Sequence, residues 1–365
     1  MSMNGTASAC SLLMMALRLV LAPTMAVGLA LADAPPTRLA IISDYGSDNG
    51  NELAVANLVK TNFRPEFVVS AGDNNYIGAS RIDDAIGKYY QQFIGNYAGR
   101  FGTGASSNCF FPALGNHDYD VSTGYAAHTN YFTLPGNERY YDFVRGPVHV
   151  FILNSEVHEP NGNTATSAQA LWFSNRIASS TSPWRVVICQ DPPYSSTRSA
   201  SWMRWPFQQW GASVVVSGDA HSYERLLQGK LTYVVNGAGG AGLSGFGSPV
   251  AGSVLRYNSA HGAMLVTATA TNIIYEFWSV ANSGTIIDRF SDQLPPVTAA
   301  RTTNNRMLLR WPTNGTDRCV LESVDAMDSK TSWAAVTQSP VIVGATRTVT
   351  LSTTGQAARY FRLRK

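Results

Sequence analysis

Short apolar runs that end in polar or glycine-containing turns recur along residues 38–292, and they constrain the fold more than any other feature of the sequence. Runs of strand length that are apolar throughout are typical of strands covered on both faces. Helical candidates lie between them at Asn51–Val59, Ile82–Phe93 and Ser167–Ala178, and Ser167 is expected to cap the last one. This alternation predicts one α/β domain. The strand candidates are Leu39–Ser43, Phe67–Ser70, Phe110–Leu114, Val148–Leu153, Val186–Cys189 and Val214–Ser217.

Five of these runs lead directly into a loop that carries Asp, Asn, Gln or His. Open α/β sheets bind ligands at the carboxyl ends of their strands, and parallel strands of one sheet present those ends at one edge. We therefore expect the loop side chains to converge. Carboxylates, an amide and imidazoles together form a mixed oxygen and nitrogen site for first-row or hard metal ions. The candidates are Asp44, Asp73, Asn116, His117, Asp118, Gln190, Asp191, Asp219 and His221.

Each candidate also has a structural alternative. An Asp that follows a strand often caps a helix or forms a turn. His221 could be a core histidine whose hydrogen bonds are satisfied within the protein. These alternatives explain single residues but not five coincident placements at strand ends, so the pattern as a whole favours a shared site.

Four motifs in this range resemble the signatures of purple acid phosphatases, a branch of the calcineurin-like metallophosphoesterase superfamily. In chain order they are Asp44-Tyr45-Gly46, Gly72-Asp73-Asn74-Asn75-Tyr76, Gly115-Asn116-His117-Asp118 and Ala220-His221-Ser222-Tyr223-Glu224-Arg225. The superfamily usually has His where this chain has Gly46, and Tyr76 would supply the missing ligand, which points to the purple branch. The segments that resemble its bacterial members are Gly146–His149, Pro192–Ser196 and Met203–Phe207. The resemblance covers about residues 38–290.

The resemblance implies a calcineurin-like metallophosphoesterase β-sandwich flanked by helices, with two metal ions in its site. Asp44, Tyr76 and His221 would hold the first ion, and Asp73 would bridge both ions. Phenolate and carboxylates are hard, anionic donors that favour Fe³⁺. Asn116 would be a neutral ligand of the second ion. The metal pair would activate water as a hydroxide for attack on phosphorus and would neutralise charge on the phosphoryl group.

The same resemblance assigns roles to residues beside the metal ions. His117 would stand next to the leaving-group oxygen as an acid or orienting group, and Asp118 would hold its tautomer. The leading hypothesis is an exported phosphomonoesterase that acts on a small phosphoester. The alternatives are a catalytically weakened homologue that still binds metal and phosphate, and a phosphodiesterase.

Two departures from the family pattern concern the second ion. The fourth signature ends in His where this chain has Gln190, and the fifth begins Gly-His where this chain has Gly218 and Asp219. Both family histidines bind the second metal. Gln190 and Asp219 each offer oxygen, so Mg²⁺ or Mn²⁺ could replace Fe or Zn there, and a weak or empty second site is equally compatible. The loop Ser195–Ser201 also lacks a His-Gly pair that relatives carry, and Arg198 could bind phosphate there or be solvated.

Residues 297–365 are predicted to form a second, smaller domain. After Ile286–Asp288 the chain passes through a stiff linker at Gln293–Pro296. Strand-type alternation then recurs between Ser, Thr and Gly turns, which predicts a small all-β sandwich. A structural spacer and a binding module are both open roles for it. The alternating segments are Met307–Trp311, Arg318–Glu322, Arg347–Leu351 and Arg359–Leu363.

Residues 1–32 have the pattern of an export signal. Arg18 precedes an apolar run, Leu19–Ala32, whose last residues Ala30-Leu31-Ala32 match the small-x-small pattern that signal peptidases accept. We expect cleavage before Asp33 and a secreted or periplasmic protein. The structural alternative is a buried N-terminal helix.

Cysteine content and charge narrow the remaining options. Removal of the leader leaves Cys109, Cys189 and Cys319, which permit at most one disulfide within the chain. A Cys109–Cys189 disulfide and two buried thiols both stay open. The net charge is +3 without any Lys/Arg-rich run, which argues against nucleic acid or an anionic membrane surface as the main partner. The oligomeric state is not fixed by the sequence.

Overall fold

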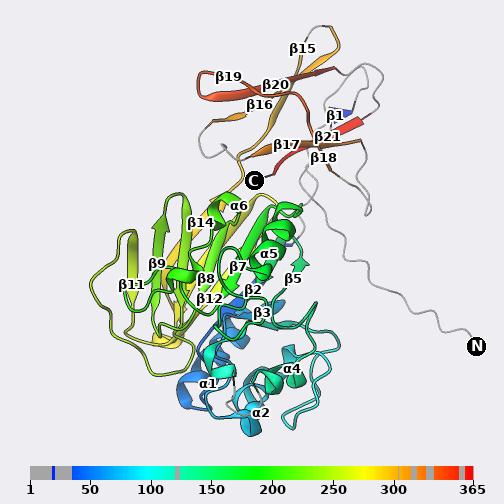
Figure 1. Cartoon of the computed structure of the whole chain (residues 1–365). Coiled ribbons are helices and arrows are strands. Elements are labelled where there is room, and N and C mark those ends of the chain that lie inside the picture. The colour runs from blue at the N-terminus through cyan, green and yellow to red at the C-terminus, as the bar shows by residue number, and fades with distance from the viewer. Residues whose placement is uncertain are drawn as a thin grey trace, which may run out of the picture. The chain divides into compact units, whose positions relative to one another are not determined.

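The computed structural model describes residues 19–20, 35–119, 124–302, 304–313, 319–325, 333–352 and 358–364 (Figure 1). The chain divides into two compact units. One unit contains Thr37–Ala268 and Ile273–Asp292, and the other contains the residues before Thr37, Thr269–Asn272 and the residues from Gln293 onward. The predicted leader lies outside the described residues except for the two-residue strand β1 (Leu19–Val20).

The larger unit is built on two sheets, of six and seven strands. The six-stranded sheet consists, in spatial order, of β14 (Thr285–Gln293), β13 (Asn272–Ser279), β12 (Gly262–Ala268), β2 (Thr37–Ile42), β3 (Phe67–Ser70) and β4 (Phe110–Pro112). The seven-stranded sheet consists of β11 (Ser253–Tyr257), β9 (Tyr223–Gln228), β10 (Leu231–Asn236), β8 (Val214–Ser217), β7 (Trp184–Cys189), β6 (Val148–Ile152) and β5 (Tyr141–Arg145).

Every strand predicted for this unit forms, and the strands are divided between two sheets. β2, β3 and β4 are parallel neighbours in one sheet, and β6, β7 and β8 are parallel neighbours in the other. The sequence pattern predicts that these strand ends meet at the edge of one sheet, and that expectation is wrong. A buried apolar run predicts a strand but does not show which strands are its neighbours. The mixed α/β fold class and the sandwich implied by the resemblance are confirmed.

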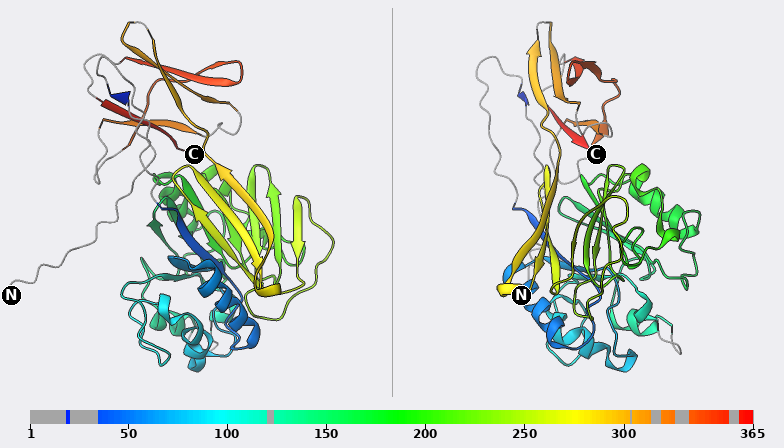
Figure 2. Two further views of the ribbon diagram at one scale, coloured as in Figure 1. Left: turned by 180° about the vertical axis from the view of Figure 1, so that it is seen from behind. Right: turned by 90° about the vertical axis from the view of Figure 1, so that its left-hand side faces the viewer.

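The two sheets pack face to face, as the right-hand view of Figure 2 shows. Phe111 of β4 stacks on Phe143 of β5 with 3.8 Å between ring centroids, and Tyr223 of β9 stacks on Phe277 of β13 at 4.1 Å. Each of these pairs joins one sheet to the other. Burial of such rings is a main source of core stability.

Helix α5 (Ala168–Ala178) covers the outer face of the seven-stranded sheet together with α6 (Phe207–Trp210) (Figure 2). Phe173 of α5 is buried in a cluster with Val187 of β7. Ser167 caps α5 as predicted, since its hydroxyl accepts a hydrogen bond from the Ala170 N–H at 3.1 Å.

Most of the other helices lie in the segments that follow β2, β3 and β4. The helix predicted at Asn51–Val59 is α1 (Gly50–Asn57), which continues as the π-helix η1 (Leu58–Phe63). The helix predicted at Ile82–Phe93 is wrong as a continuous element, because Ile86 has non-helical dihedral angles and divides it. Its pieces are α2 (Ile82–Ala85), α3 (Gly87–Tyr90) and η3 (Gln91–Phe93). The remaining helical segments are η2 (Ala79–Arg81), η4 (Asn116–Asp118), α4 (Ala126–Tyr131), η5 (Ser201–Met203) and η6 (Ala281–Ser283).

The smaller unit contains two four-stranded, all-antiparallel sheets, which agrees with the predicted all-β region. One has the order β15-β16-β20-β19 and the other β1-β21-β17-β18. A separate apolar cluster that includes Met307, Trp311 and Phe361 forms its core. The strands are β15 (Thr298–Thr302), β16 (Arg306–Pro312), β17 (Val320–Val324), β18 (Ala334–Ala335), β19 (Val341–Val343), β20 (Thr346–Ser352) and β21 (Ala358–Arg364).

Cys109 and Cys189 are both free thiols, but only Cys189 is buried, and Cys109 is half-buried just before β4, so the alternative of two buried thiols holds only for Cys189. Cys189 is buried, and its Sγ contacts the Asp191 carbonyl oxygen at 3.5 Å. Within the described part of the chain, no helix is both long enough and apolar enough for a membrane crossing.

Candidate metal centre

Four side chains from three loops converge at the carboxyl ends of the parallel strands. Ligand atoms of Asp44, Asp73 and His221 all lie within 4.8 Å of one another. The Tyr76 phenol oxygen lies among them, 3.1 Å from Oδ1 of Asp44, 2.8 Å from Oδ2 of Asp73 and 3.0 Å from Nε2 of His221. These residues follow β2, β3 and β8, so strands of both sheets contribute to one cluster.

The backbone turns at the strand ends aim the carboxylates inward. Asp44 and Asp73 both have left-handed dihedral angles, with φ of 53° and 50°. Gly46 lies directly against the backbone of Asn74, and a Cβ there would collide with the Asn74 carbonyl oxygen. The Tyr76 N–H donates to the Gly46 carbonyl oxygen at 2.7 Å. The backbone around Asn74 thus excludes a side chain at position 46, and the phenol of Tyr76 enters the cluster instead.

Burial and charge make this cluster suited to a cation. Burial raises the pKa of both Asp44 and Asp73, and repulsion from Asp73 raises the pKa of Asp44 further. Burial, and then the same two carboxylates, raises the pKa of the Tyr76 phenol well above its ordinary value. Burial and mutual repulsion therefore disfavour the charged forms of the two carboxyl groups and the phenol as long as nothing compensates their charge. A hard cation at the centre of the four donor atoms would stabilise those charged forms, so the residues fit the predicted first ion.

His221 presents its second ring nitrogen to the cluster. Its Nδ1 lies 2.8 Å from the Gly242 carbonyl oxygen, to which it donates a hydrogen bond. Nε2 therefore keeps a lone pair on the side of Tyr76 and Asp44. A backbone carbonyl behind the ring is the usual way in which proteins orient a metal-binding imidazole.

The residues predicted for the second ion are arranged differently. Gln190 is fully buried, and its amide Nε2 donates to Oδ1 of Asp44 at 3.0 Å while its Oε1 accepts from the Ser43 hydroxyl at 3.4 Å. Asp219 is also buried, and its Oδ1 pairs with Arg198 at 2.8 Å. Asn116 lies exposed in η4. An amide N–H offers no lone pair, so in this arrangement Gln190 acts as a hydrogen-bond donor toward Asp44.

Asp219 still has one unused oxygen. Its Oδ2 is buried without a hydrogen-bond partner among the described residues. Its backbone N–H donates to both carboxylate oxygens of Asp44 at 3.1 Å, from a left-handed turn with φ of 60°. The structure therefore brings Gln190 and Asp219 next to the first cluster. Their roles as ligands of a second metal stay predictions.

His117 and Asp118 lie on the same short helix, η4, but face different surroundings. The His117 ring is exposed and packs on Tyr76, with 4.3 Å between ring centroids. The Asp118 carboxylate is buried and accepts hydrogen bonds from the Asn74 side chain at 2.8 Å and from the Gly115 N–H at 2.9 Å. The expectation that Asp118 holds the tautomer of His117 is therefore wrong for this structure. Asp118 instead ties η4 to the loop that carries Asp73.

An acidic pair that the motifs did not point to lies near the second position. Glu156 and Asp191 share a side-chain hydrogen bond. Burial and nearby carboxylates, Asp191 foremost, raise the pKa of Glu156 to about 9. Burial and the carboxylates of Asp219 and Asp73 raise the pKa of Asp191 to about 6. Asp191 was among the strand-end candidates, whereas Glu156 follows β6 without any sequence signal. Arg198 is the cation that faces this group, since Asp219, Asp191 and Asp73 all raise its pKa.

Comparison with known proteins identifies the family and the fold. The model of the calcineurin-like phosphoesterase family matches residues 37–223. The fold is similar to purple acid phosphatase PPD1 from yellow lupin (Lupinus luteus) seeds, with 18% sequence identity and a TM-score of 0.60 over 71% of this chain and 54% of that one. It is also similar to GAP50, the anchor in the inner membrane complex of Plasmodium, with 17% identity and a TM-score of 0.56 over 72% of this chain and 90% of that one.

These likenesses have limited reach. The chain spans about half the length of the lupin enzyme's chain. At such identities the solved structures show a shared fold and nothing finer. A sequence comparison with curated proteins gives no match.

Proposed function

The chain belongs to the calcineurin-like phosphoesterase family, and from this premise we propose that it is a metal-dependent phosphatase that hydrolyses small phosphomonoesters. The convergence of Asp44, Asp73, Tyr76 and His221 on one point carries the proposal. The phenol within that set supports a purple acid phosphatase, and the motif segments support its bacterial branch.

The first metal position would take iron, as Fe³⁺. Asp44, Tyr76 and His221 would hold the ion, and Asp73 would stand on the side of the second position. A metal ion held there would supply Lewis acidity for water activation and positive charge for the phosphoryl group. The protein supplies the orientation, through the Gly242 carbonyl behind His221 and the Gly46 carbonyl on the Tyr76 N–H.

His117 is the residue we assign to proton donation. Its ring is exposed beside Tyr76, and no hydrogen bond to it occurs within the described residues. The His117 backbone N–H donates to Oδ1 of Asp73 at 2.9 Å, which fixes the start of the side chain relative to the cluster. A ring that is positioned but unpaired can give its proton to the ester oxygen as the phosphorus–oxygen bond breaks.

A second candidate function is a metal- and phosphate-binding homologue with weakened catalysis. The hydrogen bond from Gln190 to Asp44 and the ion pair between Asp219 and Arg198 favour it, because both use groups that a second ion would need. A second ion, if one binds, would be Fe, Zn, Mn or Mg. Under this candidate the protein holds one ion tightly and turns over slowly.

We also propose that the protein is secreted or periplasmic, which rests on the sequence of residues 1–32 alone. Sequencing of the N-terminus of protein from the native host tests this, with Asp33 as the expected first residue. Full-length protein with Met1 in the cytosol would contradict it.

Elemental analysis combined with a visible absorption spectrum and two substrates tests the function itself. The expected result is bound iron, broad visible absorption, and faster hydrolysis of 4-nitrophenyl phosphate than of bis(4-nitrophenyl) phosphate. One tightly held ion with negligible turnover would favour the binding homologue. Faster hydrolysis of the diester would identify a phosphodiesterase and overturn the proposal.

A further inference from the structure

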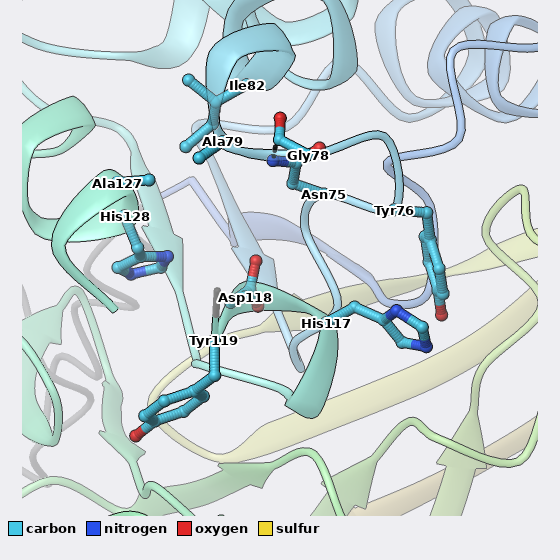
Figure 3. A pocket seen from close by; sticks show the side chains of 10 residues that line it. All are labelled: Asn75, Tyr76, Gly78, Ala79, Ile82, His117, Asp118, Tyr119, Ala127 and His128. Carbon is cyan, nitrogen blue, oxygen red and sulfur yellow. Dashed lines mark hydrogen bonds between the residues drawn. The ribbon is translucent and has the colours of Figure 1, made fainter. Parts of the chain in front are cut away.

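A cavity of about 180 Å³ lies beside the metal centre and shares two residues with it (Figure 3). Tyr76 and His117 form one side, and Tyr119 and His128 lie opposite them, with Ile82 and its neighbours above. The cavity thus begins at the ring that we assign to proton donation and extends away from the metal-binding atoms. We call it the His128 pocket.

His128 is the unusual residue in its wall. It lies on α4, is only 1% exposed, and both of its ring nitrogens lack a hydrogen-bond partner among the described residues. Its ring packs against Phe132 with 5.0 Å between centroids. A buried polar group without a partner is unfavourable, and an apolar side chain would fill this position at lower cost. An imidazole that lines a cavity and bonds to none of the described groups around it points to a ligand.

The protonation state of His128 defines which group it can recognise. Burial lowers the pKa of His128 to about 3, so the ring is neutral at ordinary pH. A neutral imidazole offers one N–H donor and one acceptor nitrogen. A hydroxyl group complements it, because a hydroxyl can donate to the imidazole nitrogen or accept from the imidazole N–H. The Asp118 carboxylate in the same wall is already hydrogen-bonded to Asn74 and Gly115, so it does not call for a cationic ligand.

The size of the cavity sets the second criterion. An engineered protein cavity of roughly 150 Å³ accommodates benzene, so this pocket has room for one six-membered ring with substituents. The Tyr76 and Tyr119 rings flank it, and the Tyr119 hydroxyl is held by the Asn154 amide at 2.7 Å.

We propose that the His128 pocket binds the alcohol part of the substrate, and that the substrate is a phosphomonoester of a small hydroxylated ring, such as a sugar phosphate. This inference rests on the proposed function. The phosphoryl group lies at the metal centre, and the alcohol extends past His117 into the pocket. Water adds to phosphorus and releases one proton to solvent, the phosphorus–oxygen ester bond breaks, and the departing oxygen takes a proton from the protonated His117 ring at the mouth of the pocket, which solvent then reprotonates.

The test uses two esters with a six-membered ring, glucose 6-phosphate and cyclohexylmethyl phosphate, which differ in the ring hydroxyl groups and the ring oxygen. Both have a primary alcohol as the leaving group, so their intrinsic reactivity is similar. The wild-type protein should prefer glucose 6-phosphate in kcat/KM by at least about tenfold. His128→Leu should lose that preference because its kcat/KM falls on glucose 6-phosphate and stays unchanged on cyclohexylmethyl phosphate. His128→Asn keeps a donor and an acceptor and should therefore recover part of the preference. Equal loss on both esters, or no preference in the wild type, overturns the inference.

Two further measurements make every outcome decisive. Ala79→Leu narrows the same cavity without changing His128, and it replaces His128→Leu as the test if that variant fails to fold. It should lower kcat/KM on both esters. An unchanged kcat/KM on both esters would contradict the pocket. Saturation-transfer NMR with free glucose reports binding without turnover. Glucose binding in a protein that hydrolyses no phosphoester would refute the proposed function but keep the pocket. Hydrolysis of phosphoesters without glucose binding would keep the proposed function but refute the pocket.

Discussion

The phenol oxygen of Tyr76 lies 3.0 Å from Nε2 of His221 and within hydrogen-bond distance of carboxylate oxygens of Asp44 and Asp73. Because Nδ1 of His221 donates to Gly242, all three neighbours of the phenol are acceptors when the carboxyl groups are ionised. One hydroxyl proton cannot satisfy three acceptors. A cation at this point can, which is why the geometry supports a metal centre rather than a structural hydrogen-bond network.

Tyr76→Phe tests the identity of the ion. If the phenolate ligates Fe³⁺, the wild-type protein should absorb broadly in the visible and the variant should lose the band while it keeps its far-ultraviolet circular dichroism. Tyr119→Phe is the matched control, since that hydroxyl binds Asn154 and should leave the band unchanged. A colourless wild type that is fully loaded with iron would show that Tyr76 is not a ligand.

His117→Ala should affect the rate according to the leaving group. General acids typically contribute about 10²–10⁴-fold, and a leaving group that departs without a proton needs less of that help. The variant should therefore lose far more kcat on an alkyl phosphate than on 4-nitrophenyl phosphate, measured by phosphate release. His158→Ala, an exposed histidine beside Tyr119, serves as the control. An equal loss on both esters would leave His117 with a role in shaping the site only.

Glu52 gives a pH dependence that is separate from the metal centre. Its Oε2 accepts the backbone N–H groups of Ser47 and Asp48, while its Oε1 is buried without a partner in the described residues. Burial raises the pKa of Glu52 to about 9 from an ordinary value of 4.5. Between those values the folded state binds the proton and the unfolded state does not. The free energy of unfolding therefore falls as pH rises from about 4.5 to about 9.

Glu52→Gln should remove that loss, because the amide imitates the protonated acid at every pH. We expect the variant to be more stable than the wild type at pH 8 by about 1–3 kcal/mol and to match it near pH 4. Urea unfolding of both proteins at the two pH values measures the difference. A variant that is less stable at pH 8 would mean that Glu52 is ionised in the folded protein.

Arg198→Met should weaken phosphate binding. Arg198 is 68% exposed and is oriented by the buried Asp219, so its guanidinium is available to a phosphate oxygen beside the centre. We expect the inhibition constant of inorganic phosphate to rise about tenfold, as the loss of one charged hydrogen bond implies. Arg289→Met removes another exposed arginine with an acidic partner and should change nothing. An unchanged inhibition constant in Arg198→Met would mean that Arg198 pairs with Asp219 but does not bind phosphate.

The sequence predicted the strands and the first cluster well because both depend on local signals. A buried run followed by an acidic turn is visible in the sequence, and Asp44, Asp73 and His221 all have that form. The partners of those residues were not predictable, because hydrogen bonds such as Gln190 to Asp44 join positions far apart in the chain. His128 was missed for a related reason. Its burial and its place in a cavity wall arise only from tertiary packing.

The space around Gln190 determines how a histidine introduced at position 190 would be oriented. A Cβ at Gly72, Gly115 or Gly218 would collide with Gln190 or crowd it, so three glycines enclose this side chain. Within that enclosure, the hydrogen bonds with Ser43 and Asp44 orient the amide with its N–H toward Asp44. A histidine at the same position would fill the enclosed space with a flat ring and could direct a lone pair, rather than a donor, toward the second position.

Gln190→His combined with Asp219→His therefore tests the history of the second site. If the two changes only weakened an inherited phosphatase, the double variant should bind a second metal ion and gain activity together, and each single variant should gain less, because affinity depends jointly on ligand number and geometry. If the site was instead retuned for a hard ion, the same variant should lose Mg²⁺- or Mn²⁺-supported activity. The bond from Gln190 to Asp44 favours weakening. Unchanged metal content together with unchanged turnover would contradict both histories, since neither position would then face a metal ion.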